Sequence, residues 1–392
     1  MSIRLALLSL LSLLLAVPAT AVDLPDMVPS IDQSLFQLRV LRHQTVPASD
    51  VAEGCAGGTD GRTLVRFTLT TTNEGTADVV LGATGCPEDA QGHSLCFGEP
   101  PPPCTNPLFV CSVAEGHHHP HFAQYALYEL LPRRGAAAAA TGRKQGFCIE
   151  NTLCDDHTYN CNNQGLKVGC MDAYFNILGC QYVDATDVPG GRYILHVEVN
   201  YAHIIPESNY DNNTAEAPVE ICDDVRKPRV DFAPAGRKAT LTSKGQVTFA
   251  KPPLVTDADP VRDGALVRVT PQNKAPLEVA IPAGARGSGC KRHDGWRPLA
   301  RGKGWLYANT SGFVDAACTV PAQGVERVRI LTRKDGFKYL VHAAVGTVPS
   351  PAPEAVTTTV VVGAETGPCG TGRVACAAGR GGRVACTTPP AS

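Results

Sequence analysis

Short stretches of alternating apolar and polar residues recur through the first half of the chain, over residues 36–40, 64–69 and 193–199. A period of two places the apolar side chains on one face of an extended strand, so these stretches predict half-buried antiparallel strands. Helical periodicity is weak, and Gly135 and Gly142 bracket the alanine run 136–140, which favours a flexible loop there. The pattern predicts a mostly β fold whose first domain is an antiparallel β-sandwich-like unit.

The second half repeats this pattern over residues 247–249, 266–269, 328–331 and 339–341, which predicts a second β domain. A Thr/Val run after residues 349–353 is interpreted as a last strand that leaves this domain. From Gly367 the motif Gly-Arg-Val-Ala-Cys occurs twice, and the segment is expected to be a small disulfide knot or a flexible basic tail. The predicted divisions are residues 22–223, 224–366 and 367–392.

The first 21 residues have the features of a secretory signal. Arg4 provides the positive end, residues 5–17 the short apolar core, and Ala19-Thr20-Ala21 a cleavage motif. No later apolar run is long enough to cross a bilayer. These features predict an exported protein, extracellular or periplasmic.

Sixteen cysteines agree with an oxidising destination, and eleven of them lie between Cys55 and Cys222. Their spacings are too wide for paired C-x-x-C zinc knuckles, so disulfides are favoured over zinc. The Pro-rich segment 86–111 is predicted to be a loop pinned by disulfides. Cys290 and Cys318 are expected to pair with each other.

The formal net charge of −2 hides an asymmetry between the two halves. Residues 22–223 hold 25 Asp and Glu against 10 Lys and Arg, whereas residues 224–392 hold 12 against 24. An acidic first half attracts cationic small molecules. The basic half is expected to dock on the acidic half or on an anionic cell surface, and no specific nucleic-acid partner is indicated.

A histidine run carries the first candidate chemistry. His117, His119 and His121 alternate, so in an extended strand their imidazoles project from one face. Imidazole suits copper, zinc, iron and nickel, and three ligands leave positions open for water or substrate. An exposed histidine patch without a metal is the alternative on this run alone.

Downstream motifs narrow these possibilities. A K-x-x-F-C segment begins at Lys144, five cysteines follow in order, and a C-x-D-x-Y segment ends at Tyr174. In this order, from about Leu24 to Cys222, the chain resembles the catalytic domain of the lysyl oxidases, which are secreted copper amine oxidases. The cysteines are Cys148, Cys154, Cys161, Cys170 and Cys180.

The resemblance implies that His117, His119 and His121 bind copper. It also implies that Lys144 and Tyr174 form lysyl tyrosylquinone, a cofactor made from the protein itself. The residue types fit this chemistry, since an oxidised phenol is an electrophile to which a neutral lysine amine adds. Asp172, two positions before Tyr174, is a candidate general base. The expected reaction takes a primary amine and dioxygen to aldehyde, hydrogen peroxide and ammonia.

The chain also departs from the animal members. Ala114-Glu115-Gly116 stands where they have a cysteine before the histidines, with Cys111 as the replacement bridging residue. Leu127 stands where they have a further histidine, which leaves proton transfer to Asp172 or water. Their matrix-directed extensions are absent, so peptidyl lysine and small diamines are both open as substrates. The high Ala, Gly, Pro and Arg content favours a bacterial source.

A second metal site is indicated by oxygen donors crowded into seven residues, a set that suits calcium. The resemblance pairs this loop with Asp26 and Met27 near the domain start, and an Asx-rich turn is the alternative. The donors are Glu207, Asn209, Asn212 and Asn213.

Two other functions remain open at this point. One is a non-catalytic copper-binding or adhesive extracellular β-protein on the same fold. The other is a zinc-dependent hydrolase built on the three histidines. Neither needs both Lys144 and Tyr174.

Overall fold

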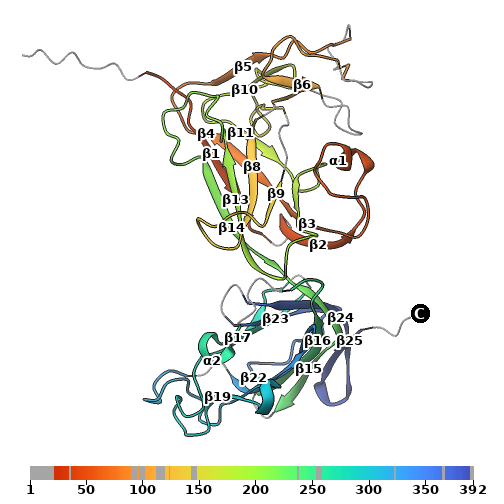
Figure 1. Ribbon diagram of the computed structural model, residues 1–392, viewed down its shortest axis with the longest axis vertical. Helices are drawn as coiled ribbons and strands as arrows, with labels where there is room; N and C mark the ends of the chain where they lie inside the picture. The colour runs from red at the N-terminus through yellow and green to blue at the C-terminus, as the bar shows by residue number, and fades with distance from the viewer. Residues whose placement is uncertain are drawn as a thin grey trace, which may run out of the picture.

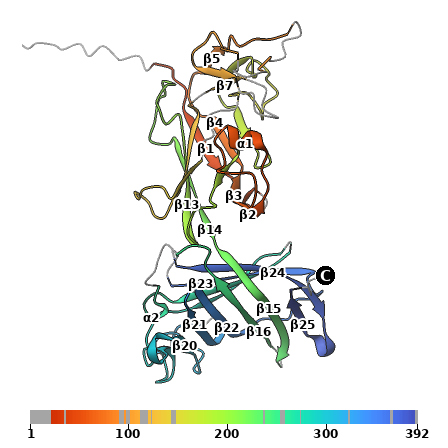
Figure 2. The same cartoon turned by 45° about the vertical axis from the view of Figure 1, so that its right-hand side comes forward.

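The computed structural model describes residues 22–34, 37–89, 95–96, 102–111, 120–122, 124–142, 148–235, 238–252, 258–272, 274–321, 324–363 and 367–388. Two β units follow one another along the longest axis of the molecule (Figures 1 and 2). Strand residues dominate, which confirms the predicted mostly β fold. The signal segment 1–21 lies outside the described residues. No helix in the described part of the chain is long and apolar enough to cross a membrane.

The first unit is built from short strands in five small sheets. Its sheets have the orders β1-β4-β11, β10-β5, β12-β3-β2, β14-β13-β8-β9 and β6-β7. The elements are β1 (Met27–Ile31), β2 (Leu38–Gln44), α1 (Ala48–Ala52), β3 (Arg62–Phe67), β4 (Leu69–Asn73), β5 (Val79–Ala83), β6 (Phe109–Cys111), β7 (Pro120–Phe122), β8 (Ala126–Leu131), β9 (Ala140–Gly142), β10 (Asn163–Leu166), β11 (Met171–Tyr174), β12 (Tyr182–Asp184), β13 (Gly191–Val199) and β14 (Thr214–Ile221).

Alternating burial along β13 shows why the sequence folds this way. Tyr193, Leu195 and Val197 point into the main core, and the residues between them are half-buried. β13 pairs with β14 on one side and β8 on the other, both antiparallel. Residues 136–139 form no helix, because they connect β8 directly to β9.

The second unit consists of one curled eleven-stranded sheet with the order β18-β17-β23-β24-β25-β15-β16-β22-β21-β20-β19. Its core is separate from that of the first unit. The elements are β15 (Asp223–Ala235), β16 (Lys238–Thr248), α2 (Pro260–Asp263), β17 (Ala265–Pro271), β18 (Leu277–Ile281), β19 (Gly295–Pro298), β20 (Gly304–Ala308), β21 (Val325–Arg333), β22 (Gly336–Val345), β23 (Ala355–Val362), β24 (Cys369–Ala378) and β25 (Val384–Thr387).

Two expectations about the C-terminal region are wrong. The Thr/Val run is β23, which lies between β17 and β24 inside the sheet rather than leaving the domain. The segment after residue 367 is neither a knot nor a separate tail, because it supplies β24 and β25. Both strands pair with β15, and their valines Val374 and Val384 are buried in the second core.

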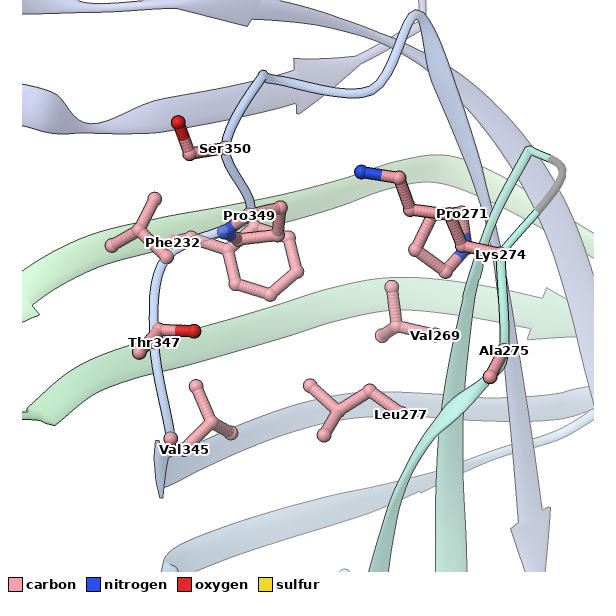
Figure 3. A pocket seen from close by; sticks show the side chains of 12 residues that line it. Phe232, Val269, Pro271, Lys274, Ala275, Leu277, Val345, Thr347, Pro349 and Ser350 are labelled. Carbon is pink, nitrogen blue, oxygen red and sulfur yellow. The ribbon is translucent and has the colours of Figure 1, made fainter.

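One end of the curled sheet opens into a hollow of about 610 Å³ (Figure 3). Its floor is apolar, with Phe232, Val269 and Val345 buried in the sheet. The loop that carries Pro349 and the exposed Lys274 line its mouth.

Eight disulfides pair all sixteen cysteines, so no thiolate is left for zinc and the predicted disulfides are confirmed. Two of them, Cys86–Cys104 and Cys96–Cys111, pin the Pro-rich loop. Cys290 pairs with Cys318 as expected. Cys222–Cys369 joins the end of the first unit to β24 of the second.

Candidate active site

The short strand β11 places Asp172 and Tyr174 on one face, because side chains two positions apart in a strand point the same way. Both side chains are buried, with 1% and 3% of their surface exposed. β11 pairs with β4, where Asp172 lies opposite Thr71 and Tyr174 opposite Leu69. The predicted base and the predicted cofactor tyrosine are therefore neighbours inside the first core.

The Tyr174 hydroxyl lies between two acceptors. It is 2.8 Å from the backbone carbonyl of Cys148 and makes a short hydrogen bond to Oδ2 of Asp172. The other carboxylate oxygen, Oδ1, accepts from the Thr152 hydroxyl at 2.8 Å. The phenol has one proton, so a neutral Asp172 donates to the phenol oxygen while Tyr174 donates to Cys148. Whether Asp172 is neutral or ionised, one proton therefore lies between its carboxyl group and the Tyr174 phenol.

Burial governs the electrostatics of this pair. It raises the pKa of Asp172 to about 7, and the nearby Glu150 carboxyl adds to the rise, while the hydrogen bonds from Tyr174 and Thr152 oppose it. Burial and the Asp172 charge hold the pKa of the Tyr174 phenol well above its usual value. The carboxyl thus changes charge near neutral pH and the phenol keeps its proton there.

A second buried tyrosine, Tyr125, lies beside Tyr174 and was not identified from the sequence. The rings of Tyr125 and Tyr174 are 5.3 Å apart at their centroids, tilted by 51°. The Tyr125 hydroxyl is 2.6 Å from Oγ1 of Thr71 on β4. Tyr125 follows the histidine run by four residues, and this proximity was the only sequence signal for it.

A buried glutamine, Gln164, connects the segments around the site. Its Oε1 accepts from the backbone of Ile149 at 3.0 Å, and its Nε2 donates to the Pro120 carbonyl at 3.0 Å. The Cys148–Cys161 disulfide closes the same loop. The segment that starts at Cys148 is thereby fixed against β7, the strand that carries the last histidine of the run.

His121 is the member of the histidine run that the structure describes. It lies on β7, opposite Val110 of β6, with 7% of its surface exposed. His117, His119 and Lys144 lie outside the described residues. In the sequence Lys144 is four positions before Cys148, whose carbonyl accepts from Tyr174. Imidazole is a ligand type that suits copper, so His121 fits a copper site.

The predicted calcium residues also gather, at the start of the first unit. The buried Glu207 accepts from the backbone of Met27 at 2.6 Å and from Nδ2 of Asn213 at 2.9 Å. Nδ2 of Asn212 donates to Asp26 at 3.2 Å. Asn209 is exposed, and its Oδ1 instead caps the turn by accepting from the backbone of Asp211.

Three oxygens in this cluster are buried without a hydrogen-bond partner among the described residues: Oδ1 of Asp26, of Asn212 and of Asn213. Buried acceptors of this kind are rare, because each forfeits its hydration. Carboxylate and amide oxygens are the ligands that calcium takes. Asn200, which donates to Glu207 at 2.5 Å, also belongs to the cluster and has no sequence signal of its own.

Comparison with known proteins relates the first unit of this chain to one family. Residues 105–227 match the family model described as Lysyl oxidase. The chain is 30% identical over 206 residues to protein-lysine 6-oxidase of Gallus gallus, covering 48% of this chain and 44% of that protein. It is 31% identical over 206 residues to lysyl oxidase homolog 1 of Homo sapiens, covering 48% and 32%. Identity reaches 40% over 106 residues of lysyl oxidase homolog 2A of Danio rerio, covering 25% and 14%. The chain thus spans less than half the length of each of these relatives.

Proposed function

We propose, from the premise that this chain belongs to the lysyl oxidase family, that it is an exported copper-dependent amine oxidase. It converts primary amines, peptidyl lysine or small diamines, to aldehydes and releases hydrogen peroxide and ammonia. The observation that carries the proposal is the buried contact between the Tyr174 hydroxyl, the Asp172 carboxyl and the Cys148 carbonyl. Export rests on the signal-like segment 1–21 and on the sixteen paired cysteines.

In this proposal His117, His119 and His121 hold the copper, and Lys144 and Tyr174 are the two halves of the quinone. When formed, lysyl tyrosylquinone supplies a carbonyl that a primary amine attacks, and dioxygen restores its oxidised form. The Cys148–Cys161 disulfide and Gln164 fix Cys148 and Ile149, the described residues that follow Lys144 in the chain, and the Cys148 carbonyl accepts from Tyr174. A lysine held close to Tyr174 would lower the entropic cost of joining the two residues.

Asp172 is the residue that takes the proton from the carbon next to the substrate nitrogen. A pKa near 7 makes it ionised for part of the time at neutral pH and still basic enough to accept a proton. Thr152 orients the carboxyl through Oδ1 and leaves Oδ2 directed at position 174. Tyr125 covers one side of the ring and excludes water from it.

A non-catalytic copper-binding or adhesive protein is the alternative. The presence of both Lys144 and Tyr174 in the sequence argues against it, because neither copper binding nor adhesion needs that pair. The same argument applies to a zinc hydrolase, which needs a base beside its metal rather than beside a tyrosine.

Peptide mass mapping of the aerobically copper-loaded full chain tests the proposal. Active protein is expected to give one covalently joined fragment that contains residues 144 and 174 and carries a quinone absorbance. Lys144→Ala should lose the joined fragment and keep copper. The matched variant Lys167→Ala, an exposed lysine of the same unit paired with Asp156, should keep both. Separate, unmodified fragments from active enzyme would refute the cross-link.

The oxygen cluster around Glu207 is proposed as a calcium site that fixes the start of the first unit to the loop after β13. The three buried oxygens without hydrogen-bond partners support it, because one calcium ion would be coordinated by all three. Asp26 and Glu207 supply the negative charge, and the amide oxygens of Asn212 and Asn213 complete the donor set.

A further inference from the structure

Six neighbouring strands of the second unit present one continuous outer face (Figure 2). Their order is β15, β16, β22, β21, β20 and β19. One row of directly paired positions crosses all six strands, and the inward neighbours of this row fill the core. The row is Arg229, Lys244, Leu340, Arg329, Leu306 and Arg297.

Cations dominate this face. Arg229, Lys244, Arg329 and Arg297 of the row are exposed, and the adjacent outward positions add further cations. Its acidic groups in the described residues are Asp224 near the start of β15, Asp231, which pairs with Arg229, and Glu326, 3.5 Å from His342. β16, β19, β20 and β22 contain no Asp or Glu. The added cations are Arg226, Arg327 and Lys338.

A shallow hollow of about 410 Å³ lies at one end of the face. Four cations line it, Arg226, Lys227, Lys244 and Lys338, and no carboxylate does. The hollow follows a bulge in β15, where the pairing with β16 shifts between Arg226 and Arg229. Lys227 adopts a φ of 51° there, so consecutive cations of β15 turn toward the same space. One anionic group fits among these side chains.

We propose that this face binds a linear acidic polysaccharide, a polymer of sugars that carry sulfate, phosphate or carboxylate groups. Neighbouring strands are about 4.8 Å apart, so Lys244 and Arg329 are separated by about 10 Å at the backbone. The row therefore offers charges one or two strand spacings apart, about 5 to 10 Å, across the outer face of the curled sheet. An extended polymer with repeated anionic groups matches this spacing, whereas a single small anion uses only the hollow.

The composition of the face separates this ligand from other polyanions. Its outward positions on the described strands hold no Phe, Tyr or Trp side chain, and single-stranded nucleic acid binds by stacking its bases on aromatic rings. Leu340, 37% exposed, is its prominent apolar residue, which gives a lipid bilayer little to bury. Charge alone remains as the means of recognition.

Binding of the intact protein to immobilised heparin tests the proposal, with neutral dextran as the uncharged control. Lys244→Glu/Lys338→Glu reverses two charges at the hollow. Lys274→Glu/Arg292→Glu makes the same change in net charge on exposed loops elsewhere in the second unit. We expect the first pair to weaken heparin binding about tenfold or more at low salt, and the second less than twofold. Melting temperatures of both pairs report whether the fold is kept.

If the charge-reversed pair fails to fold, Lys244→Gln/Lys338→Gln replaces it, with a smaller loss of binding expected. Equal weakening by both pairs would mean that net charge rather than this face binds heparin, and would overturn the proposal. Equal retention on heparin and dextran would do the same. Tighter binding to poly(U) or to phosphatidylglycerol vesicles than to heparin, lost in the Lys244/Lys338 pair, would assign the face to nucleic acid or to membranes instead.

Discussion

The two units of this chain are both built from strands, but different interactions stabilise them. The second unit is one continuous sheet in which every strand pairs with a neighbour, and its core is mostly Val, Ile and aromatic side chains. The first unit is divided into five small sheets joined by long loops, and five disulfides lie within it. Regular pairing stabilises the second unit, whereas cross-links hold the first.

The difference continues in the interior. Among the described residues, fifteen of the nineteen buried polar or charged side chains precede Ser243. Buried polar groups need partners, and irregular loops supply backbone partners that a regular sheet has already used. Gln164 and Asn200 donate in this way to the backbone carbonyls of the loop residues Cys161 and Ile205 in the first unit. The candidate chemistry lies in the less regular unit because that unit accommodates polar groups in its core.

The strongest test of this comparison contrasts two buried aspartates of the first unit. Asp172→Asn keeps the shape of the side chain and removes the proposed base, so we expect kcat/KM for a primary amine to fall by about 10²–10⁴. Asp50 likewise receives a hydrogen bond from a tyrosine, Tyr182, at 2.8 Å, and Tyr182 belongs to a different hydrophobic cluster from Tyr174. Asp50→Asn should lower stability by about 1–3 kcal/mol and leave the turnover of the folded fraction unchanged.

Steady-state peroxide release and thermal melts measure the two effects separately. Similar loss of turnover in both variants at equal folded fraction would mean that Asp172 only supports the fold.

The pH dependence of activity and of stability is expected to be the second effect, smaller than that of Asp172→Asn on turnover. The base must be ionised, and burial raises the pKa of Asp172 to about 7, so activity should rise with pH and level off above about 7. The folded state holds this proton more tightly than the unfolded chain. The contribution to stability is therefore fully present below the unfolded pKa and is lost as pH rises through about 7.

The rise in activity and the loss of stability with pH both come from the ionisation of Asp172. Asp172→Asn should therefore remove the pH dependence of stability as well. Unfolding free energies of wild type and Asp172→Asn across pH 4 to 8 measure it. A constant difference between the two proteins would remove Asp172 as the titrating group.

Sequence patterns predict the regular parts of the molecule and the chemical residue types. Alternation over residues 193–199 identifies β13, because one buried face suffices to fix a strand. The order of cysteines and the position of Tyr174 identify the candidate site by resemblance. Tyr125 and Gln164 escape prediction, since their roles arise only when disulfide-closed loops bring distant backbone together.

The strands β24 and β25 could not be predicted from the sequence for another reason. The segments around Val374 and Val384 are rich in glycine, which is a weak strand former. They become strands because β15 offers them pairing partners. This pairing with β15 is a tertiary interaction, so the local sequence does not predict it.

Calcium removal should affect the first unit alone. Chelation abolishes binding linkage worth about 2.7 kcal/mol at a hundredfold excess of calcium over Kd, which corresponds to several degrees in melting temperature. Glu207→Ala should remove the response to chelator. Glu216→Ala, which alters an exposed ion pair with Arg134 in the same unit, should keep it. Identical melting curves with and without chelator at saturating calcium would discard the site.

The smallest expected effect concerns the opposite charges of the two halves. Residues 22–223 carry 25 acidic against 10 basic residues, which raises the local concentration of a cationic diamine near the site. Added salt screens this attraction, so kcat/KM for a diamine should fall a few-fold between about 0.01 and 0.15 M ionic strength. A monoamine of similar length, which carries one positive charge fewer, should lose less. The Lys244→Glu/Lys338→Glu pair provides the control within the molecule, because it changes the basic unit and not the acidic one. Its salt dependence for the diamine should match that of the wild type. A diamine rate that does not respond to salt, or one that responds only when the basic face is altered, would show that the acidic half does not gather the substrate.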